Sequence, residues 1–261
     1  MPKKQTYRER YTNKIIAEGG EAPALKERVP RIPVDPALQL PYAEGKVILI
    51  DKPLHWTSFD VVRKLRSTIQ IKKIGHAGTL DPLATGLLIV CTGKFTKKIN
   101  EYMAAEKEYT GHFVAGAITP TYDLESEPVD FKDYSSLTQE NIHAATALFT
   151  GEIDQFPPIY SAIKKDGVAL YDLARRGEAV EVKSRKVTIS QFEITKIDLP
   201  VIEFNVVCST GTYIRSLAND LGQALGCGAY LGSLRRTRIG HIKAEEATDM
   251  DTFIQNFSAK S

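Results

Sequence analysis

Two short apolar runs constrain the fold of this 261-residue chain more than any other feature of its sequence. Residues 46–50 and 87–92 are almost continuously hydrophobic, and the first run is followed by a Lys-Pro turn. Such runs are far too short to span a bilayer, but they are typical of fully buried strands. We therefore expect a sheet with buried central strands and no transmembrane segment.

The rest of the chain mixes helical and strand-like patterns without regularity. Ser58 can cap a helix whose apolar face includes Phe59 and Ile69, and residues 201–208 alternate as a strand does. Further helices are expected near residues 95–103, 139–149, 168–176 and 213–225, and further strands near 108–117 and 181–189. Because these elements follow no βαβ rhythm, the pattern predicts an α+β fold.

The two ends of the chain differ from its middle. Residues 1–44 carry six of the 13 prolines and show no sustained periodicity, which predicts an extended arm. The first residues are charged rather than apolar, so no secretory signal is indicated and the cytoplasm is the expected compartment. We expect one folded domain over residues 45–246 and a short tail over 247–261.

Cysteine and histidine spacing matches no common metal or redox motif. Cys91, Cys208 and Cys227 are separated by 117 and 19 residues, and the five histidines include no His-Glu-x-x-His pair. We expect reduced, buried thiols and no metal ion.

Charge is distributed unevenly, although the net charge is only +2. Residues 61–80 contain five basic side chains and no acid, whereas residues 119–155 contain eight acids and a single lysine. A second basic cluster lies at 235–238. This distribution indicates a basic face that could contact phosphates; the alternative is a set of ordinary solvated surfaces.

The segment from Gly75 to Gly86 is the most informative for chemistry. Its three glycines permit a tight loop, and the carboxylate of Asp81 could point into a cleft. Asp81 followed by Pro82 is also how many helices begin, with the aspartate as N-cap. Local pattern alone favours the cap.

Five motifs, in order along the chain, resemble those of the TruB family, the bacterial tRNA pseudouridine-55 synthases. They are Leu-Ile-Asp-Lys-Pro at 49–53, Gly-His-Ala-Gly-Thr-Leu-Asp-Pro-Leu-Ala-Thr-Gly at 75–86, Lys-Glu-Tyr at 107–109, Tyr-Ser-Ala-Ile-Lys at 160–164 and Gly-Thr-Tyr-Ile-Arg-Ser-Leu at 211–217. Several long motifs in the same order make chance agreement improbable.

The resemblance implies isomerisation, without cofactor or metal, of a uridine in the T-loop of tRNA to pseudouridine. It implies a pseudouridine synthase fold, a central mixed sheet flanked by helices, with residues 45–246 as the catalytic domain. The expected partner is the T-arm of tRNA, and a monomer is expected. Only 15 residues follow Glu246, so the C-terminal PUA domain of many members is not expected.

The resemblance also assigns catalytic residues. Asp81 would be the catalytic carboxylate, adding to the uracil ring or to the sugar, or removing a ribose proton; the sequence leaves these routes open. Arg215 is its expected partner, since a guanidinium lowers the pKa of a carboxylate and fixes its direction. Tyr109 would lie against the target base. Alternatives from local pattern are a phosphate-binding or surface Arg215 and a tyrosine buried in a strand.

Five further residues are assigned to substrate binding. By resemblance, Tyr213 and Leu234 contact the substrate, and His76 fills space vacated in the T-loop. Lys52 could support the Asp81 loop, contact a phosphate or be a solvated turn residue. Asp123 matches an acidic position that helps orient the arginine, although its neighbours depart from the family pattern.

Two other functions remain open at this point. One is the catalytic subunit of an RNA-guided pseudouridine synthase, which shares the motif around Asp81. The other is an RNA-binding or RNA-folding module without turnover, against which the retention of Asp81, Tyr109 and Arg215 argues.

Overall fold

The protein is described by a computed structural model over residues 33–161, 164–165, 168–169, 176 and 182–259. Most of the helix predicted near 168–176 lies outside these residues. Its first two residues form a strand, β7 (Val168–Ala169), which pairs with β6 (Lys164–Lys165), so the prediction is wrong at that point. The three cysteines are free and buried, as the sequence predicts.

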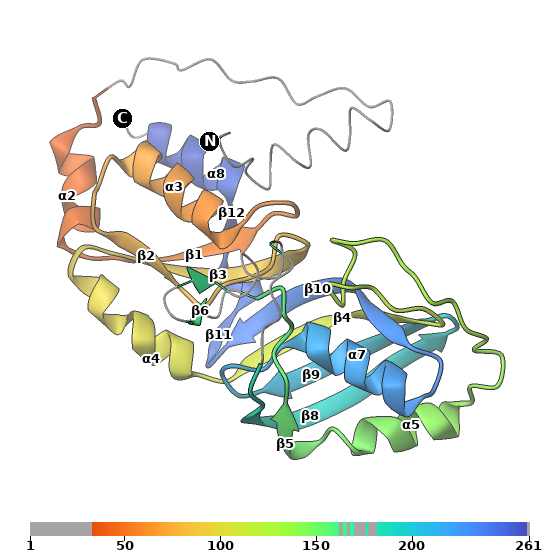
Figure 1. The fold of residues 1–261 in the computed structure, drawn as a ribbon. Helices are drawn as coiled ribbons and strands as arrows, with labels where there is room; N and C mark the ends of the chain where they lie inside the picture. The colour runs from red at the N-terminus through yellow and green to blue at the C-terminus, as the bar shows by residue number, and fades with distance from the viewer. Residues whose placement is uncertain (1–32, 162–163, 166–167, 170–175, 177–181, 260–261) are drawn as a thin grey trace, which may run out of the picture.

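A continuous mixed sheet forms the centre of the molecule (Figure 1). Its strands are β1 (Val47–Lys52), β2 (Ile74–Ala77), β3 (Ala84–Thr92), β4 (Lys107–Ala115), β5 (Gly151–Gln155), β8 (Arg185–Asp198), β9 (Val201–Cys208), β10 (Ala229–Ile239), β11 (Ile242–Lys243) and β12 (Thr248–Asp249). The order is β12-β1-β3-β10-β4-β9-β8-β5, with β2 on β3 and β11 on β10. The β1–β12 and β3–β10 pairs are parallel and the others antiparallel, so the predicted α+β class and mixed sheet are confirmed.

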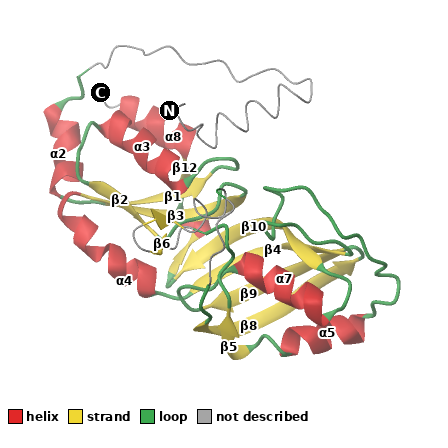
Figure 2. Cartoon of the chain, viewed as in Figure 1, coloured by secondary structure: helices red, strands yellow, loops and turns green. Residues whose placement is uncertain are grey.

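Helices pack on both halves of this sheet (Figure 2). They are α2 (Pro36–Glu44), α3 (Ser58–Ile69), α4 (Ile99–Ala104), α5 (Gln139–Ala147), α7 (Ile214–Ala224) and α8 (Met250–Ser258), with 3-10 turns η1 (Gly93–Lys98) and η2 (Ala244–Glu246). α3 and α8 lie side by side over the half with β1, whereas α7 and α5 lie against the half with β4, β9 and β8 (Figure 1). No helix of the described residues is long and apolar enough to cross a membrane.

Helix α3 begins one residue earlier than its apolar pattern suggests. Thr57 rather than Ser58 is the N-cap, and it exchanges hydrogen bonds with Asp60 in a capping box. Phe59 is 58% exposed, so it is wrongly assigned to the buried face, which Val61 shares with Ile69. Ser58 therefore does not cap the helix, and its hydroxyl oxygen instead accepts from the Leu80 N–H.

The two ends are more ordered than predicted. Residues 36–44 form α2 instead of an extended arm, because Asp35 caps a helix with proline at N1, where the missing N–H costs nothing. The Tyr42 ring packs edge-on against Phe253 and Phe257 of α8. Residues 1–32 lie outside the described residues. The predicted tail is also wrong, since β12 and α8 complete the core around β1.

Strand β10, which the sequence pattern does not predict, joins the two halves of the sheet. It pairs in parallel with β3, so that Leu234 lies opposite Ala84 and Arg236 opposite Gly86. A Cβ on Gly86 would lie 2.3 Å from the Arg236 carbonyl oxygen, and its φ of +100° suits glycine. Two register shifts against β4 break the alternation that reveals other strands. The β3–β10 junction brings the loop after β2 beside β4 and α7.

Candidate active site

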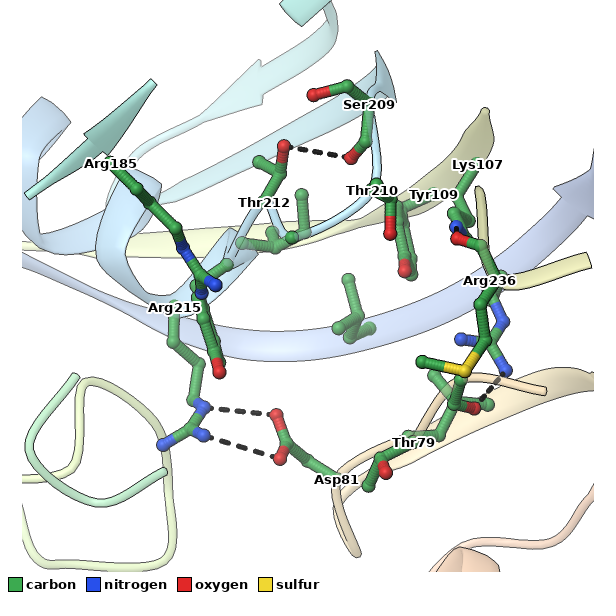
Figure 3. Close-up of a pocket in the computed structure, with 17 residues that line it drawn as sticks. Thr79, Asp81, Lys107, Tyr109, Arg185, Ser209, Thr210, Thr212, Arg215 and Arg236 are labelled. Atoms are coloured by element: carbon green, nitrogen blue, oxygen red, sulfur yellow. Dashed lines mark hydrogen bonds and ion pairs between the residues drawn. The ribbon is translucent and has the colours of Figure 1, made fainter. Parts of the chain in front are cut away.

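A cavity of about 340 Å³ opens where these elements meet (Figure 3). Its wall comes from the loop after β2, from β4, β8 and β10, and from the loop that leads into α7. Figure 3 shows Arg185 and Arg215 on one side of this space and Lys107 and Arg236 on the other. Among the described residues, the cavity is therefore lined by several cations around a single carboxylate, that of Asp81.

Asp81 is held by Arg215 through two hydrogen bonds. Arg215 Nε donates to Oδ2 at 3.0 Å and Nη2 donates to Oδ1 at 3.3 Å. The carboxylate side chain is 34% exposed, whereas that of Arg215 is 6% exposed. This two-point contact fixes the plane of the carboxylate while leaving it open to the cavity.

The guanidinium of Arg215 has further partners behind the cavity. Nη1 donates to the carbonyl oxygens of Thr121 and Tyr160, and Nη2 also donates to Tyr160, each at 3.1 Å. Asp123 Oδ2 lies 3.7 Å from Nε. Burial lowers the pKa of Arg215, but Asp81 and Asp123 outweigh it, and the net direction is upward. Arg215 is thus neither a surface residue nor a free phosphate ligand.

Asp123 is the buried member of this network. It is 3% exposed, and its Oδ1 accepts from the Glu125 N–H at 3.0 Å. Burial raises the pKa of the Asp123 carboxyl, and the neighbouring Arg215 works against that rise. Asp123 lies behind the main cavity and touches a smaller one beside Leu234, so its place is that of an orienting residue.

The loop that carries Asp81 is clamped on both sides. Ser58 Oγ accepts from the Leu80 N–H at 2.8 Å and lies 3.2 Å from the Leu80 carbonyl oxygen. The Pro82 carbonyl oxygen accepts from the His55 N–H at 2.8 Å. No helix follows Asp81: the chain makes a turn and enters β3 at Ala84, so the N-cap interpretation is wrong.

Lys52 is part of the same clamp. Its ammonium donates to the carbonyl oxygens of Pro53, Trp56 and Pro82, at 3.0, 2.6 and 3.4 Å. The side chain is fully buried, which lowers its pKa to about 8. Lys52 is therefore not solvated and does not line the cavity; it supports the loop beside Asp81.

Tyr109 lines the cavity from β4, opposite Arg236 of β10 in the sheet register. It is 9% exposed. Burial raises the pKa of its phenol, and the Arg236 guanidinium beside it lowers that pKa by less. The phenol therefore stays neutral, and the ring forms part of the cavity wall although most of it is buried.

The remaining predicted residues separate into two groups. Tyr213 and Leu234 both line the cavity with Asp81. His76 lies on β2 opposite Val90 and does not line it. Burial and the nearby Arg236 both lower the pKa of His76. The structure therefore brings seven of the eight predicted residues into the cavity or the network supporting it, and leaves His76 outside.

Three cationic residues of the cavity are missing from the sequence-based assignment. Lys107 donates to the Met103 carbonyl oxygen, and Arg236 donates to the carbonyl oxygens of Leu87 and Gly78 at 2.8 and 3.2 Å. Arg185 enters from β8. Lys107 stands in the same short motif as Tyr109, and that motif could have identified it as a cavity residue. The positions of Arg185 and Arg236 depend on strand register, which the sequence does not show.

The basic cluster at 235–238 is not the phosphate surface it was expected to be. Arg235 binds both carboxylate oxygens of Asp51, at 2.9 and 2.7 Å. Arg238 pairs with Glu108 at 2.8 Å and with Glu106 at 3.1 Å. Since Arg236 is buried, the cluster ties strands together instead.

Two family models match the chain. The model described as "TruB family pseudouridylate synthase (N terminal domain)" matches residues 66–214, and "tRNA pseudouridylate synthase B C-terminal domain" matches residues 215–260. Together they contain the cavity-lining residues from Gly78 to Arg236.

Individual proteins show the same likeness. A tRNA pseudouridine synthase B from Flavobacterium johnsoniae is 57% identical over 219 residues, which cover 81% of this chain and 96% of that protein. One from Phocaeicola vulgatus is 48% identical over 218 residues, with 81% and 93% covered. Among solved structures, the crystal structure of a Cbf5-Nop10-Gar1 complex contains a chain with a TM-score of 0.65 and 29% identity; the match covers 88% of this chain but 60% of that one.

Proposed function

The chain belongs to the TruB family of pseudouridylate synthases, and on that premise we propose that it converts uridine to pseudouridine in the T-loop of tRNA, at position 55 in tRNA numbering. The expected family and pseudouridine synthase fold are confirmed. In the proposal Asp81 is the catalytic carboxylate, and the reaction takes place in the cytoplasm.

The reaction is an isomerisation whose atoms balance within the nucleotide. The bond between C1′ of the ribose and N1 of uracil breaks, the base turns, and a bond forms between C1′ and C5. The hydrogen on C5 leaves as a proton, and N1 ends with a proton. No electrons are gained or lost overall, so the chain needs to supply only acid–base groups, a carboxylate and a binding surface for the extracted base.

The observation that carries the proposal is the Asp81–Arg215 pair at an open cavity. A carboxylate that attacks or takes a proton must be ionised, accessible and fixed in direction. The two hydrogen bonds from Arg215 fix it, and its 34% exposure leaves it accessible. A cavity of about 340 Å³ is in the range of small-molecule sites.

The extracted base would lie between Asp81, Tyr109 and Leu234. Unstacking a base costs a few kcal/mol, and stacking on an aromatic ring returns about 1 to 3 kcal/mol. Tyr109 can supply that ring, and its phenol can relay the C5 proton by accepting it at the oxygen while its own proton passes to N1 or to solvent. Whether Asp81 adds to the uracil ring, adds to C1′ or removes a ribose proton stays open.

Release of tritium from tRNA labelled at C5 of uridine tests the proposal. The purified chain alone should release tritium from one uridine per unmodified tRNA. A chain that acts only as an RNA-guided subunit would need a guide RNA, and a module without turnover would bind the tRNA and release nothing. Failure to release tritium with the chain alone would therefore contradict the proposal.

The T-arm is proposed as the recognised element. An isolated T-stem-loop hairpin should then be modified with kcat/KM close to that of full tRNA, whereas an inert hairpin would contradict recognition through the T-arm. We also propose that the chain acts as a monomer. Sedimentation at the concentrations used for the assay checks the second point.

A further inference from the structure

Arg185, at the start of β8, lines the cavity and carries two buried hydrogen-bond donors that have no partner among the described residues. These donors are its Nε and Nη2 atoms. The guanidinium stacks on the Tyr213 ring, with 4.7 Å from Cζ to the ring centroid. Figure 3 shows the side chain reaching from β8 toward Arg215. Stacking fixes the guanidinium plane, while Nε and Nη2 stay without a partner in the described part of the chain.

The same edge is used elsewhere in the cavity. Arg215 employs Nε and Nη2 to hold the two oxygens of Asp81. In Arg185 the equivalent two donors have no hydrogen-bond partner among the described residues. Two parallel N–H groups match two oxygens of one anion, a carboxylate or a phosphate. Burying charged donors without a hydrogen bond costs free energy. A ligand that supplies two oxygens therefore gains more binding free energy than a ligand that supplies a single neutral carbonyl oxygen.

The charge balance of the cavity also favours an anion. Arg215 is matched by Asp81 and Asp123. Within the described parts of the chain, no carboxylate lies within 4 Å of a cationic nitrogen of Arg185, Lys107 or Arg236. The polar partners of Lys107 and Arg236 are carbonyl oxygens. Among the described residues, the cavity therefore holds three positive charges that no acid within 4 Å offsets.

We propose that Arg185 binds a backbone phosphodiester next to the target nucleotide, with Tyr213 holding its guanidinium in place. This proposal rests on the proposed function, which makes RNA the ligand. A phosphodiester is the anion that every nucleotide of an RNA carries, and it offers two oxygens to the two unpaired donors of Arg185. Arg185 is thus a binding residue that locates the backbone while Asp81 faces the sugar and base.

A chemical double-mutant cycle tests this contact. The probes are T-stem-loop hairpins in which one phosphate, either 5′ or 3′ to the target uridine, is replaced by a neutral methylphosphonate. Dissociation constants are measured in the Asp81→Asn background, which leaves the RNA unreacted, with and without Arg185→Gln. Turnover of the unaltered hairpin by the otherwise wild-type enzyme is measured separately, so that failure of the proposed function is recognised on its own.

For one of the two phosphates, we expect methylphosphonate to weaken binding about 10-fold when Arg185 is present and by less than 2-fold when glutamine replaces it. Arg185→Gln should lower the salt slope of binding by about one. Arg185→Lys should keep that slope but bind less tightly, since an ammonium lacks the fork. Equal methylphosphonate penalties at both positions with and without Arg185 would overturn the proposal, as would an unchanged salt slope.

Lys186→Gln is the matched control. It removes one positive charge from the next position of the same strand, where the side chain is 69% exposed and pairs with Glu152. It should leave the methylphosphonate penalties unchanged. Thermal melting of each variant verifies that the fold is kept, because Arg185 contributes a stacking contact to Tyr213.

Discussion

Arg215 and Asp81 are joined by hydrogen bonds of 3.0 and 3.3 Å although 134 residues separate them in the chain. Arg215 comes from the first turn of α7, whereas Asp81 stands in the loop before β3. The parallel β3–β10 pair and the packing of α7 on β10 bring the two elements together. The geometry of this candidate site therefore depends on the junction between the two halves of the sheet.

Replacing Asp81 by asparagine should abolish turnover while leaving the fold intact. Asparagine keeps the volume but cannot attack a carbon or take a proton, so kcat should fall on the order of 10³-fold or more. Because Asp81 is partly exposed and Arg215 retains Asp123 and two carbonyl oxygens, the loss of unfolding free energy should stay within about 2 kcal/mol. Tritium release and urea unfolding measure the two effects. Substantial residual turnover would remove Asp81 from its catalytic role.

Replacing Arg215 by lysine should also remove most activity, although the charge is kept. The guanidinium makes five hydrogen bonds to Asp81, Thr121 and Tyr160, which three ammonium donors cannot reproduce in the same directions. We expect kcat to fall about 100-fold and stability to fall by about 3 kcal/mol. Near-normal kcat in a folded variant would show that a point charge suffices.

Site residues that stand in local sequence motifs can be predicted from the sequence, whereas those placed by strand register cannot. Asp81, Tyr109 and Arg215 stand in long motifs, and the structure brings all three to one cavity. Arg185 and Arg236 stand in no recognised motif; their place follows from strand pairings between residues far apart in sequence.

Local patterns also mislead where tertiary contacts override them. Phe59 fits the apolar period of α3 but is 58% exposed, so no part of the described chain covers that edge of the helix. Asp81-Pro82 has the form of a helix start, yet the bonds from Ser58, Lys52 and His55 hold the segment as a loop. Residues 36–44 form a helix that packs on α8, more than 200 residues away, which provides an apolar surface.

Phosphate contacts outside the cavity should come from lysines around η1 rather than from residues 235–238. Lys72, Lys73, Lys94, Lys97 and Lys98 are exposed, and the Gly93 N–H donates to the Lys73 carbonyl oxygen at 2.9 Å, which brings the two groups together. Replacing two of them by glutamine should lower the salt slope of tRNA binding by about two. Lys196→Gln, near Asp198 and Glu203, is the control and should change nothing. An unchanged slope in the double variant would exclude this surface.

The stability of the protein should rise with pH because of Lys52. Burial lowers the pKa of its ammonium from its usual value of 10.5 to about 8, so between these values the unfolded chain binds more protons than the folded one. Folding is thus favoured as pH rises through this window, by up to about 3 kcal/mol over the full shift. This gain in unfolding free energy is complete above pH 10.5 and is lost as the pH falls through 8.

Comparison with Lys52→Met isolates this effect from other titrating groups. Urea unfolding at pH 7, 8, 9 and 10 should show the wild type gaining stability relative to the variant at each step above pH 8. Lys94→Met, which removes an exposed lysine, controls for the loss of one positive charge. The Lys52→Met variant should also have a lower kcat, because the Pro82 carbonyl oxygen, one residue after Asp81, loses the Lys52 donor. A stability difference that stays constant or shrinks with rising pH would mean that the ammonium of Lys52 is stabilised in the fold, and that the three carbonyl oxygens outweigh its burial.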